Sequence, residues 1–141
     1  FCTGPGRNAL KLGELLVALE FPPPSAKSGA RFLRFIPRNE MDIAVTNAAS
    51  WVQLDASGRT ITEARVAIGA VAPTPLLLAD AAAALKGAPA DAESFERAAA
   101  IASAASQPIT DMRGNVEQRR HLAAVLTKRT LEGAVERARM N

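Results

Sequence analysis

One short segment, residues 31–43, concentrates the charged side chains that could do chemistry. It holds three arginines and two carboxylates beside apolar, strand-like residues. Strand alternation places Arg34 on the same face as Phe32 and Ile36. A guanidinium on an apolar sheet face needs a carboxylate, a backbone carbonyl, or an anionic or aromatic ligand as its partner. The pattern therefore predicts a ligand contact by Arg34 or, as the plainer alternative, a salt-bridged strand end.

Other residue types that support catalysis are few. His121 is the only histidine, and the pattern around it is helical, with no serine singled out as a nucleophile. Cys2 is the only cysteine, so the chain has neither an internal disulfide nor a cysteine-based metal site. Glycine-rich phosphate-binding patterns are missing from the sequence. We therefore expect no catalytic residue and no metal site, and we interpret Cys2 as an inert thiol.

Composition and charge describe an ordinary globular chain of 141 residues. Apolar residues make up 48% and charged residues 22%, which is enough for one core without disulfides or metals. The net charge is +3, but basic and acidic residues are interspersed and aromatic–basic interleaving is missing, so we expect no nucleic-acid partner. No apolar run approaches the ~20 residues of a membrane span, so we expect no membrane association. These features predict a single domain over residues 1–141.

Apolar alternation predicts four strands in the first half of the chain, at residues 15–21, 30–36, 43–54 and 60–69. Prolines follow the first two strands and end them, because proline cannot donate to a ladder. The third strand carries small residues on both faces, which is typical of a strand covered on both sides. Residues 55–58 have the composition of a hairpin turn. We expect an antiparallel meander.

The second half of the chain is helical by composition. We expect helices at residues 76–86, 91–105 and 115–139, with Gly87 as a C-terminal cap and with Asp91 and Asn115 as N-terminal caps. Strands followed by helices predict an α+β fold, in which an antiparallel sheet is followed by a three-helix bundle packed on one side.

Two arginines interrupt the apolar arc of the last predicted helix. On a wheel at ~100° per residue, Arg119 and Arg120 fall within or at the edge of that arc. A buried guanidinium must be paired, and the nearby candidates are Asp111, which we prefer, and Glu117. The alternative is that both arginines extend to water.

Five motifs in a fixed order give the chain a resemblance to a known family. They are residues 13–22, the basic position Arg34 with the turn and Asp-Ile-Ala at 37–44, the strand-to-helix junction 67–75, the loop 108–114, and the helix start 117–122. Each motif alone is weak. Together, from about residue 10 to 139, the chain resembles the C-terminal domain of the FAD-binding (medium) subunit of molybdenum hydroxylases, the family of carbon monoxide dehydrogenase and xanthine dehydrogenase.

The resemblance implies an activity that the residues alone do not show. Members of this family oxidise a substrate at a molybdopterin cofactor and pass electrons through 2Fe–2S clusters to FAD, which reduces an external acceptor. The chain is then part of a cytoplasmic oxidoreductase subunit and is not catalytic alone. Its implied partners are N-terminal FAD-binding subdomains, a molybdopterin subunit and an iron–sulfur subunit.

Two residues match cofactor-contacting positions of that family. The resemblance gives Leu16 an apolar contact with the flavin and Arg34 a basic contact with the cofactor, and we expect both on one exposed rim of the sheet, on neighbouring strands. The glycine-rich loops that hold the pyrophosphate in the family are missing, so we do not expect the chain alone to retain FAD. The alternative function is a stand-alone, non-catalytic interaction module.

Overall fold

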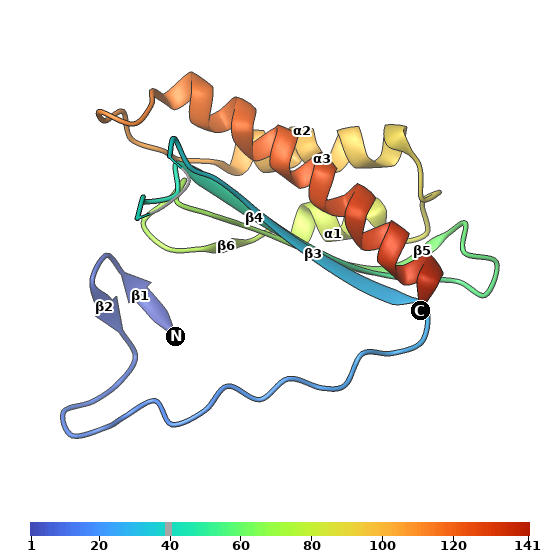
Figure 1. Cartoon of the computed structure of the whole chain (residues 1–141), viewed down its shortest axis with the longest axis horizontal. Helices are drawn as coiled ribbons and strands as arrows, with labels where there is room; N and C mark the ends of the chain where they lie inside the picture. The colour runs from blue at the N-terminus through green and yellow to red at the C-terminus, as the bar shows by residue number, and fades with distance from the viewer. Residues whose placement is uncertain (39–40) are drawn as a thin grey trace.

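The computed structural model describes residues 1–38 and 41–141, and in it strands precede helices along the chain (Figure 1). In chain order, the elements are β1 (Cys2–Gly4), β2 (Arg7–Asn8), β3 (Ser28–Phe35), β4 (Thr46–Leu54), β5 (Ile61–Gly69), β6 (Leu76–Leu77), α1 (Ala79–Leu85), α2 (Ala92–Ala105) and α3 (Val116–Met140). β3, β4, β5 and β6 form one antiparallel sheet in that order, while β1 and β2 form a separate hairpin. The predicted α+β fold is confirmed.

Three of the four predicted strands are confirmed, with ends shifted by a few residues, as β3, β4 and β5. The predicted first strand at residues 15–21 is wrong for this chain, because these residues form an extended segment without a ladder. Alternation shows that a segment can form a strand, but a ladder also needs the edge of a second strand. The two-residue strand β6 was not predicted, since it is too short to show a period.

The helices begin and end close to the predicted caps. The Asp91 side chain accepts a hydrogen bond from Ser94 N at 2.9 Å, and the Asn115 side chain accepts one from Gln118 N at 2.8 Å. Gly87 follows α1 with φ +79°, a left-handed conformation that glycine adopts without strain. α1 begins at residue 79 rather than at the expected 76, because the residues of β6 pair with β5 instead.

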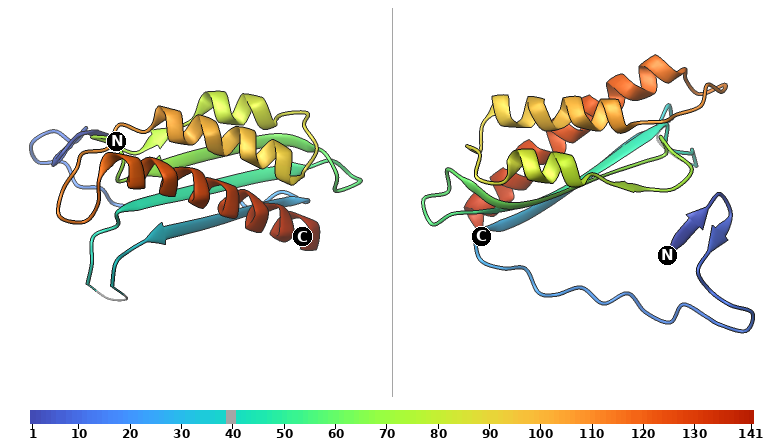
Figure 2. Two further views of the ribbon diagram at one scale, coloured as in Figure 1. Left: turned by 90° about the horizontal axis from the view of Figure 1, so that it is seen from above. Right: turned by 180° about the vertical axis from the view of Figure 1, so that it is seen from behind.

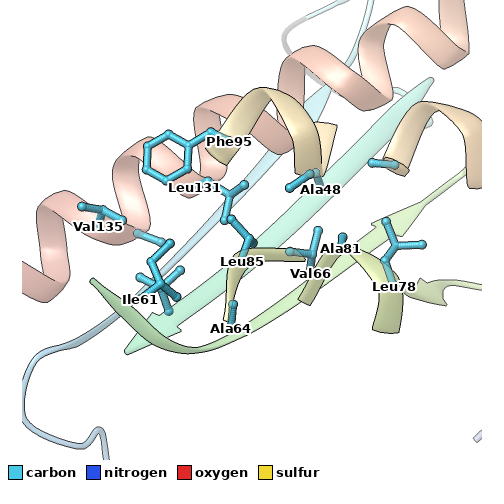
Figure 3. Close-up of a cluster of buried hydrophobic side chains, with 14 of the residues drawn as sticks. Ala48, Ile61, Ala64, Val66, Leu78, Ala81, Leu85, Phe95, Leu131 and Val135 are labelled. Carbon is cyan, nitrogen blue, oxygen red and sulfur yellow. The ribbon is translucent and has the colours of Figure 1, made fainter. Parts of the chain in front are cut away.

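All three helices lie on one face of the sheet (Figure 2). α3 crosses β3 and β4, α1 packs on β5, and α2 packs against the other two helices. Buried apolar side chains fill this layer, with Ile61, Leu85 and Leu131 among the largest (Figure 3). α3 lies so close to β3 that a Cβ at Gly29 would collide with the Ala134 carbonyl oxygen. The predicted one-sided helix layer is therefore confirmed.

Alternate side chains of the strands point to opposite faces of the sheet. The helices cover one face, and we call the other the open face. Along β4, every second residue from Thr46 to Leu54 is buried, and the residues between them are only partly buried. The strand register assigns these residues of β3, β4 and β5 to the open face: Ala30, Phe32, Arg34, Asn47, Ala49, Trp51, Gln53, Glu63, Arg65, Ala67 and Gly69. The expectation that residues 43–54 are covered on both faces is met on one face only.

Residues 1–20 lie apart from the sheet and its helices, whereas residues 21–24 line a hollow together with residues of the sheet such as Ala30 and Trp51. The segment leaves the sheet at the start of β3 and runs on the side opposite the helices (Figures 1 and 2). None of these residues is buried. Within the described part of the chain, no hydrogen bond joins them to residues 26–141. The folded unit of sheet and helices therefore begins near residue 25.

Candidate functional site

The open face has two alanines in adjacent strands, Ala49 and Ala67, which we call its floor, and a cation, Arg34, near one end. The register aligns Arg34, Asn47 and Gly69 in one row across β3, β4 and β5. The next row consists of an aromatic ring and two alanines: Phe32, Ala49 and Ala67. Small side chains in adjacent strands let a flat group approach the sheet closely. The arrangement therefore favours a planar or apolar partner at this end of the face.

A hollow of about 370 Å³ opens on the open face, and Phe32, Ala49 and Trp51 are among the residues that line it. The guanidinium carbon of Arg65 lies 5.6 Å from the centroid of the Trp51 ring, a cation–π contact. Arg65 Nη2 also lies 3.9 Å from Glu63 Oε1, in an exposed and therefore weak ion pair. The hollow thus has an apolar floor and a positively charged rim.

Arg34 is exposed at the other end of the open face. Its guanidinium makes no hydrogen bond or ion pair with any residue of 1–38 or 41–141. Its neighbours in the row, Asn47 and Gly69, carry no charge. A salt bridge of Arg34 is therefore not found among the described residues, and Glu40 of the same charged segment lies outside them. Nothing in the described part of the chain competes with a ligand for this guanidinium.

An alternating chain of charges lies next to the Arg34 end of the sheet. Arg38 Nε is 3.3 Å from Asp42 Oδ2, and Arg113 Nε is 3.8 Å from Asp42 Oδ1. Arg113 Nη1 is 4.0 Å from Asp111 Oδ2, and Arg119 Nη2 is 2.7 Å from Asp111 Oδ1. The charges tie the loop between β3 and β4 to the loop between α2 and α3, and so they fix this end of the sheet.

The carboxylates of this charge chain are held in the ionised form. Burial alone would raise the pKa of Asp42, but hydrogen bonds from Arg38 and from Ile43 N, together with nearby positive charges, lower that pKa below its ordinary value. The pKa of Asp111 is also lowered, first by the hydrogen bond from Arg113 N. Both groups are therefore hydrogen-bond acceptors at neutral pH, which suits a structural role rather than proton transfer.

Arg119 confirms the prediction of a buried, paired guanidinium with Asp111 as its partner. Only 4% of Arg119 is exposed. Its Nη1 donates to Val45 O at 2.8 Å and to Ala70 O at 3.3 Å. These carbonyls lie just before β4 and just after β5, so one side chain holds both strand ends. The row that contains Arg34 begins at those ends, and Arg119 is therefore part of its support.

The remaining residues considered from the sequence lie elsewhere. Leu16 is 52% exposed and lies in the unpaired segment, so the expectation that it shares a sheet rim with Arg34 on a neighbouring strand is wrong for this chain. Arg120 and His121 are exposed on α3, and Cys2 is exposed in β1. The Arg120 side chain is exposed, as the extended-to-water alternative expects, but its Nε also donates to Ser106 O at 3.4 Å. The cofactor contacts of Leu16 and Arg34 stay predictions.

The floor itself was not singled out from the sequence. Its signal is present, because Ala49 and Ala67 fall on the same side of adjacent strands, but that side becomes recognisable only when the register is known. The described residues contain no group of three or more His, Cys, Asp or Glu side chains that could hold a metal ion. None of the helices in the described ranges has the length and apolar character needed to cross a membrane.

Comparison with known proteins assigns the fold to a family. Residues 31–134 match the family described as CO dehydrogenase flavoprotein C-terminal domain, which is well over half of the chain. The chain belongs to this family. The CO dehydrogenase flavoprotein C-terminal domain thus accounts for the sheet from β3 onward, for α1 and α2, and for most of α3.

Relatives and solved structures extend this finding over nearly the whole chain. The xanthine dehydrogenase FAD-binding subunit of Escherichia coli is 32% identical over 139 residues, which are 98% of this chain and 47% of the relative. The carbon monoxide dehydrogenase medium chain of Afipia carboxidovorans is 34% identical over 132 residues, or 94% and 45% of the two chains. Quinoline 2-oxidoreductase from Pseudomonas putida 86 superposes with a TM-score of 0.88 at 29% identity, over 98% of this chain and 47% of that chain. The chain therefore spans about half the length of the relatives it matches.

Proposed function

We propose that the chain is the C-terminal part of the FAD-carrying subunit of a molybdenum hydroxylase, and that its open face covers bound FAD. The observation that carries this proposal is the open face itself. Its small-residue floor and its cation, Arg34, lie uncovered by the helices, in a domain whose relatives are named FAD-binding subunits. The proposed activity of the whole subunit is that of an oxidoreductase component.

The residues of the open face fit one part of a flavin site. Ala49 and Ala67 permit a flat ring system to lie close to the sheet, Phe32 adds an apolar edge, and Arg34 adds a positive charge. The phosphates of FAD need a different site, because the sequence has no glycine-rich phosphate loop. We therefore assign pyrophosphate binding to the other half of the subunit and the covering of the ring system to this chain.

The chemistry that bound FAD supplies is reversible electron uptake. The residues of this chain would orient the ring system and exclude water from it. A positive charge at Arg34 favours the additional negative charge that reduction brings, so Arg34 would make reduction easier. Arg119 would act at a distance, by holding the ends of β4 and β5 in place.

The proposal also includes the partners of the subunit. Relatives include medium chains of carbon monoxide dehydrogenase, and a solved structure of the Hydrogenophaga pseudoflava enzyme is described as lacking the Mo-pyranopterin moiety of the molybdenum cofactor. By this analogy the partners are a molybdopterin subunit and an iron–sulfur subunit, and the assembly is cytoplasmic. The substrate pocket then lies in a different subunit.

A substitution that fills the space above the floor of the open face tests this proposal. In the complete subunit, Ala49→Trp places a large ring where the flavin ring system would lie, and flavin retention after gel filtration should fall at least about tenfold. Ala100→Trp, an equally large change on the exposed side of α2, is the matched control and should keep the flavin. The isolated chain should be colourless with either substitution and should melt close to the parent chain. A fully loaded Ala49→Trp subunit would show that the open face does not cover the flavin.

A further inference from the structure

The segment of residues 15–21 has the composition of a buried strand, yet it is exposed. The exposed fractions are 85% for Leu15, 52% for Leu16, 92% for Val17, 71% for Leu19 and 82% for Phe21. Both alternating sets of side chains are apolar, apart from a glutamate at position 20. Strands with two apolar faces occur inside sheets that are covered on both sides. The segment therefore needs a sheet and two covering layers that the described chain does not give it.

The nearest strand edge in the chain is closed to this segment. β3 is an edge strand that pairs only with β4. Along the first half of β3, the Ala30 carbonyl accepts a hydrogen bond from Arg137 Nη1 at 2.6 Å, and the Ser28 carbonyl accepts one from Asn141 Nδ2 at 3.2 Å. Side chains from the end of α3 thus occupy acceptors that an added strand would use.

The family match also indicates that residues 15–21 do not belong to the C-terminal domain. The C-terminal domain model begins at residue 31, after the segment. Matches to full-length relatives nevertheless cover 98% of this chain and 47% of the relative, so those relatives also carry a counterpart of the segment. The segment is therefore shared by the subunits but lies outside the domain. Three prolines at 22–24 separate the segment from the domain. They end the strand-like pattern and form a stiff spacer.

We propose that residues 15–21 form a strand in a sheet of the other half of the subunit, and that the boundary between the two halves lies at about Ser25. This inference rests on the proposed function, because it requires the flavin-binding half as the partner. The recognition is β-strand addition, in which main-chain hydrogen bonds bind the segment and its two apolar faces pack inside the partner. The strand joins the two halves, and the proline spacer sets the position of the open face relative to the flavin-binding half.

Hydrogen exchange of the backbone amides tests the inference. In the complete subunit, the amides of residues 15–21 should exchange at least about 100-fold more slowly than in the isolated chain. A difference below about tenfold would overturn the inference. Strong protection in the isolated chain would also overturn it, because the segment would then pair with its own domain or with a second copy.

Substitutions in residues 15–21 distinguish backbone hydrogen bonding of this segment from packing of its apolar side chains alone. Alternate N–H groups of an edge strand face its neighbour, so at least one of Val17→Pro and Ala18→Pro should abolish the protection in the complete subunit. Val17→Ala keeps the N–H group and should keep most of the protection. In the isolated chain, all three variants should melt like the parent, because residues 17 and 18 are exposed there and form no hydrogen bond with the sheet. Protection that survives both prolines would overturn the ladder.

The outcome for this inference is distinct from that for the proposed function. A complete subunit that carries FAD while residues 15–21 exchange freely would overturn the strand addition alone. A colourless subunit in which residues 15–21 are protected would overturn the flavin proposal alone.

Discussion

The two faces of the sheet are built from alternate residues of the same strands, but they differ in what surrounds them. On the covered face of β4, Ser50 is buried and forms a hydrogen bond of 2.8 Å with Thr130 of α3. One residue away on the open face, Ala49 and Trp51 are only partly buried and line a hollow. The covered face therefore holds most of the interactions that stabilise the domain, whereas these residues of the open face remain accessible.

The largest effect is expected at the buried arginine. Arg119→Ala leaves Asp111 without its main side-chain partner and two carbonyls without donors, so the free energy of unfolding should fall by about 3–5 kcal/mol. Arg120→Ala, one residue further along α3, removes an exposed side chain whose one hydrogen bond, from Nε to Ser106 O, is long at 3.4 Å, and it should cost less than about 1 kcal/mol. Urea unfolding of the isolated chain measures both. Equal losses for the two variants would show that Arg119 is not a structural clamp.

A slightly smaller effect is expected in the apolar core. Ile61 is fully buried on the covered face, and Ile61→Ala should cost about 2–5 kcal/mol. Phe32 lies on the open face and is 57% exposed, so Phe32→Ala should cost less than about 1 kcal/mol in the isolated chain, although it removes a larger side chain. Thermal or urea unfolding measures the contrast. A large loss for Phe32→Ala would mean that the open face also stabilises the isolated domain.

The pH dependence should show a still smaller effect. The pKa values of Asp42 and Asp111 are lowered in the folded chain, so the folded state binds these protons less readily than the unfolded state does. Their stabilising contribution is fully present above the ordinary carboxyl pKa near about 4 and is lost as the pH falls through the folded-state values. The melting temperature should therefore fall below about pH 4. Asp111→Asn should melt lower at pH 7 and lose less on acidification; an unchanged acid slope in this variant would exclude Asp111 as a contributor.

The sequence is sufficient for those features that short-range patterns encode. Alternation and turn residues predict β3, β4 and β5, the caps Asp91 and Asn115 place two helix starts, and a charge on an apolar arc identifies Arg119 and its partner Asp111. These features depend on neighbours within one strand, one helical turn or one loop, and so a single sequence reveals them.

The sequence is insufficient where structure depends on a partner or on register. Residues 15–21 have the alternation of a strand, but their pairing depends on an edge that this chain does not supply. The floor formed by Ala49 and Ala67 depends on the register of two strands and on which face the helices cover. The segment that carries Arg34 is predicted correctly as a strand. The charge of Arg34 alone does not show whether its guanidinium pairs with a carboxylate or binds a ligand.

The most direct test of the account is flavin retention by the complete subunit when the cation of the open face is removed. Arg34→Ala should lower flavin occupancy after gel filtration by about tenfold or more, because one charge-assisted contact contributes about 1.5–3 kcal/mol. The flavin that remains should have a more negative reduction potential. Arg129→Ala, which removes the same charge from the exposed side of α3, is the control and should change neither quantity. Unchanged occupancy and potential in Arg34→Ala would contradict the account and reduce Arg34 to an ordinary exposed strand residue.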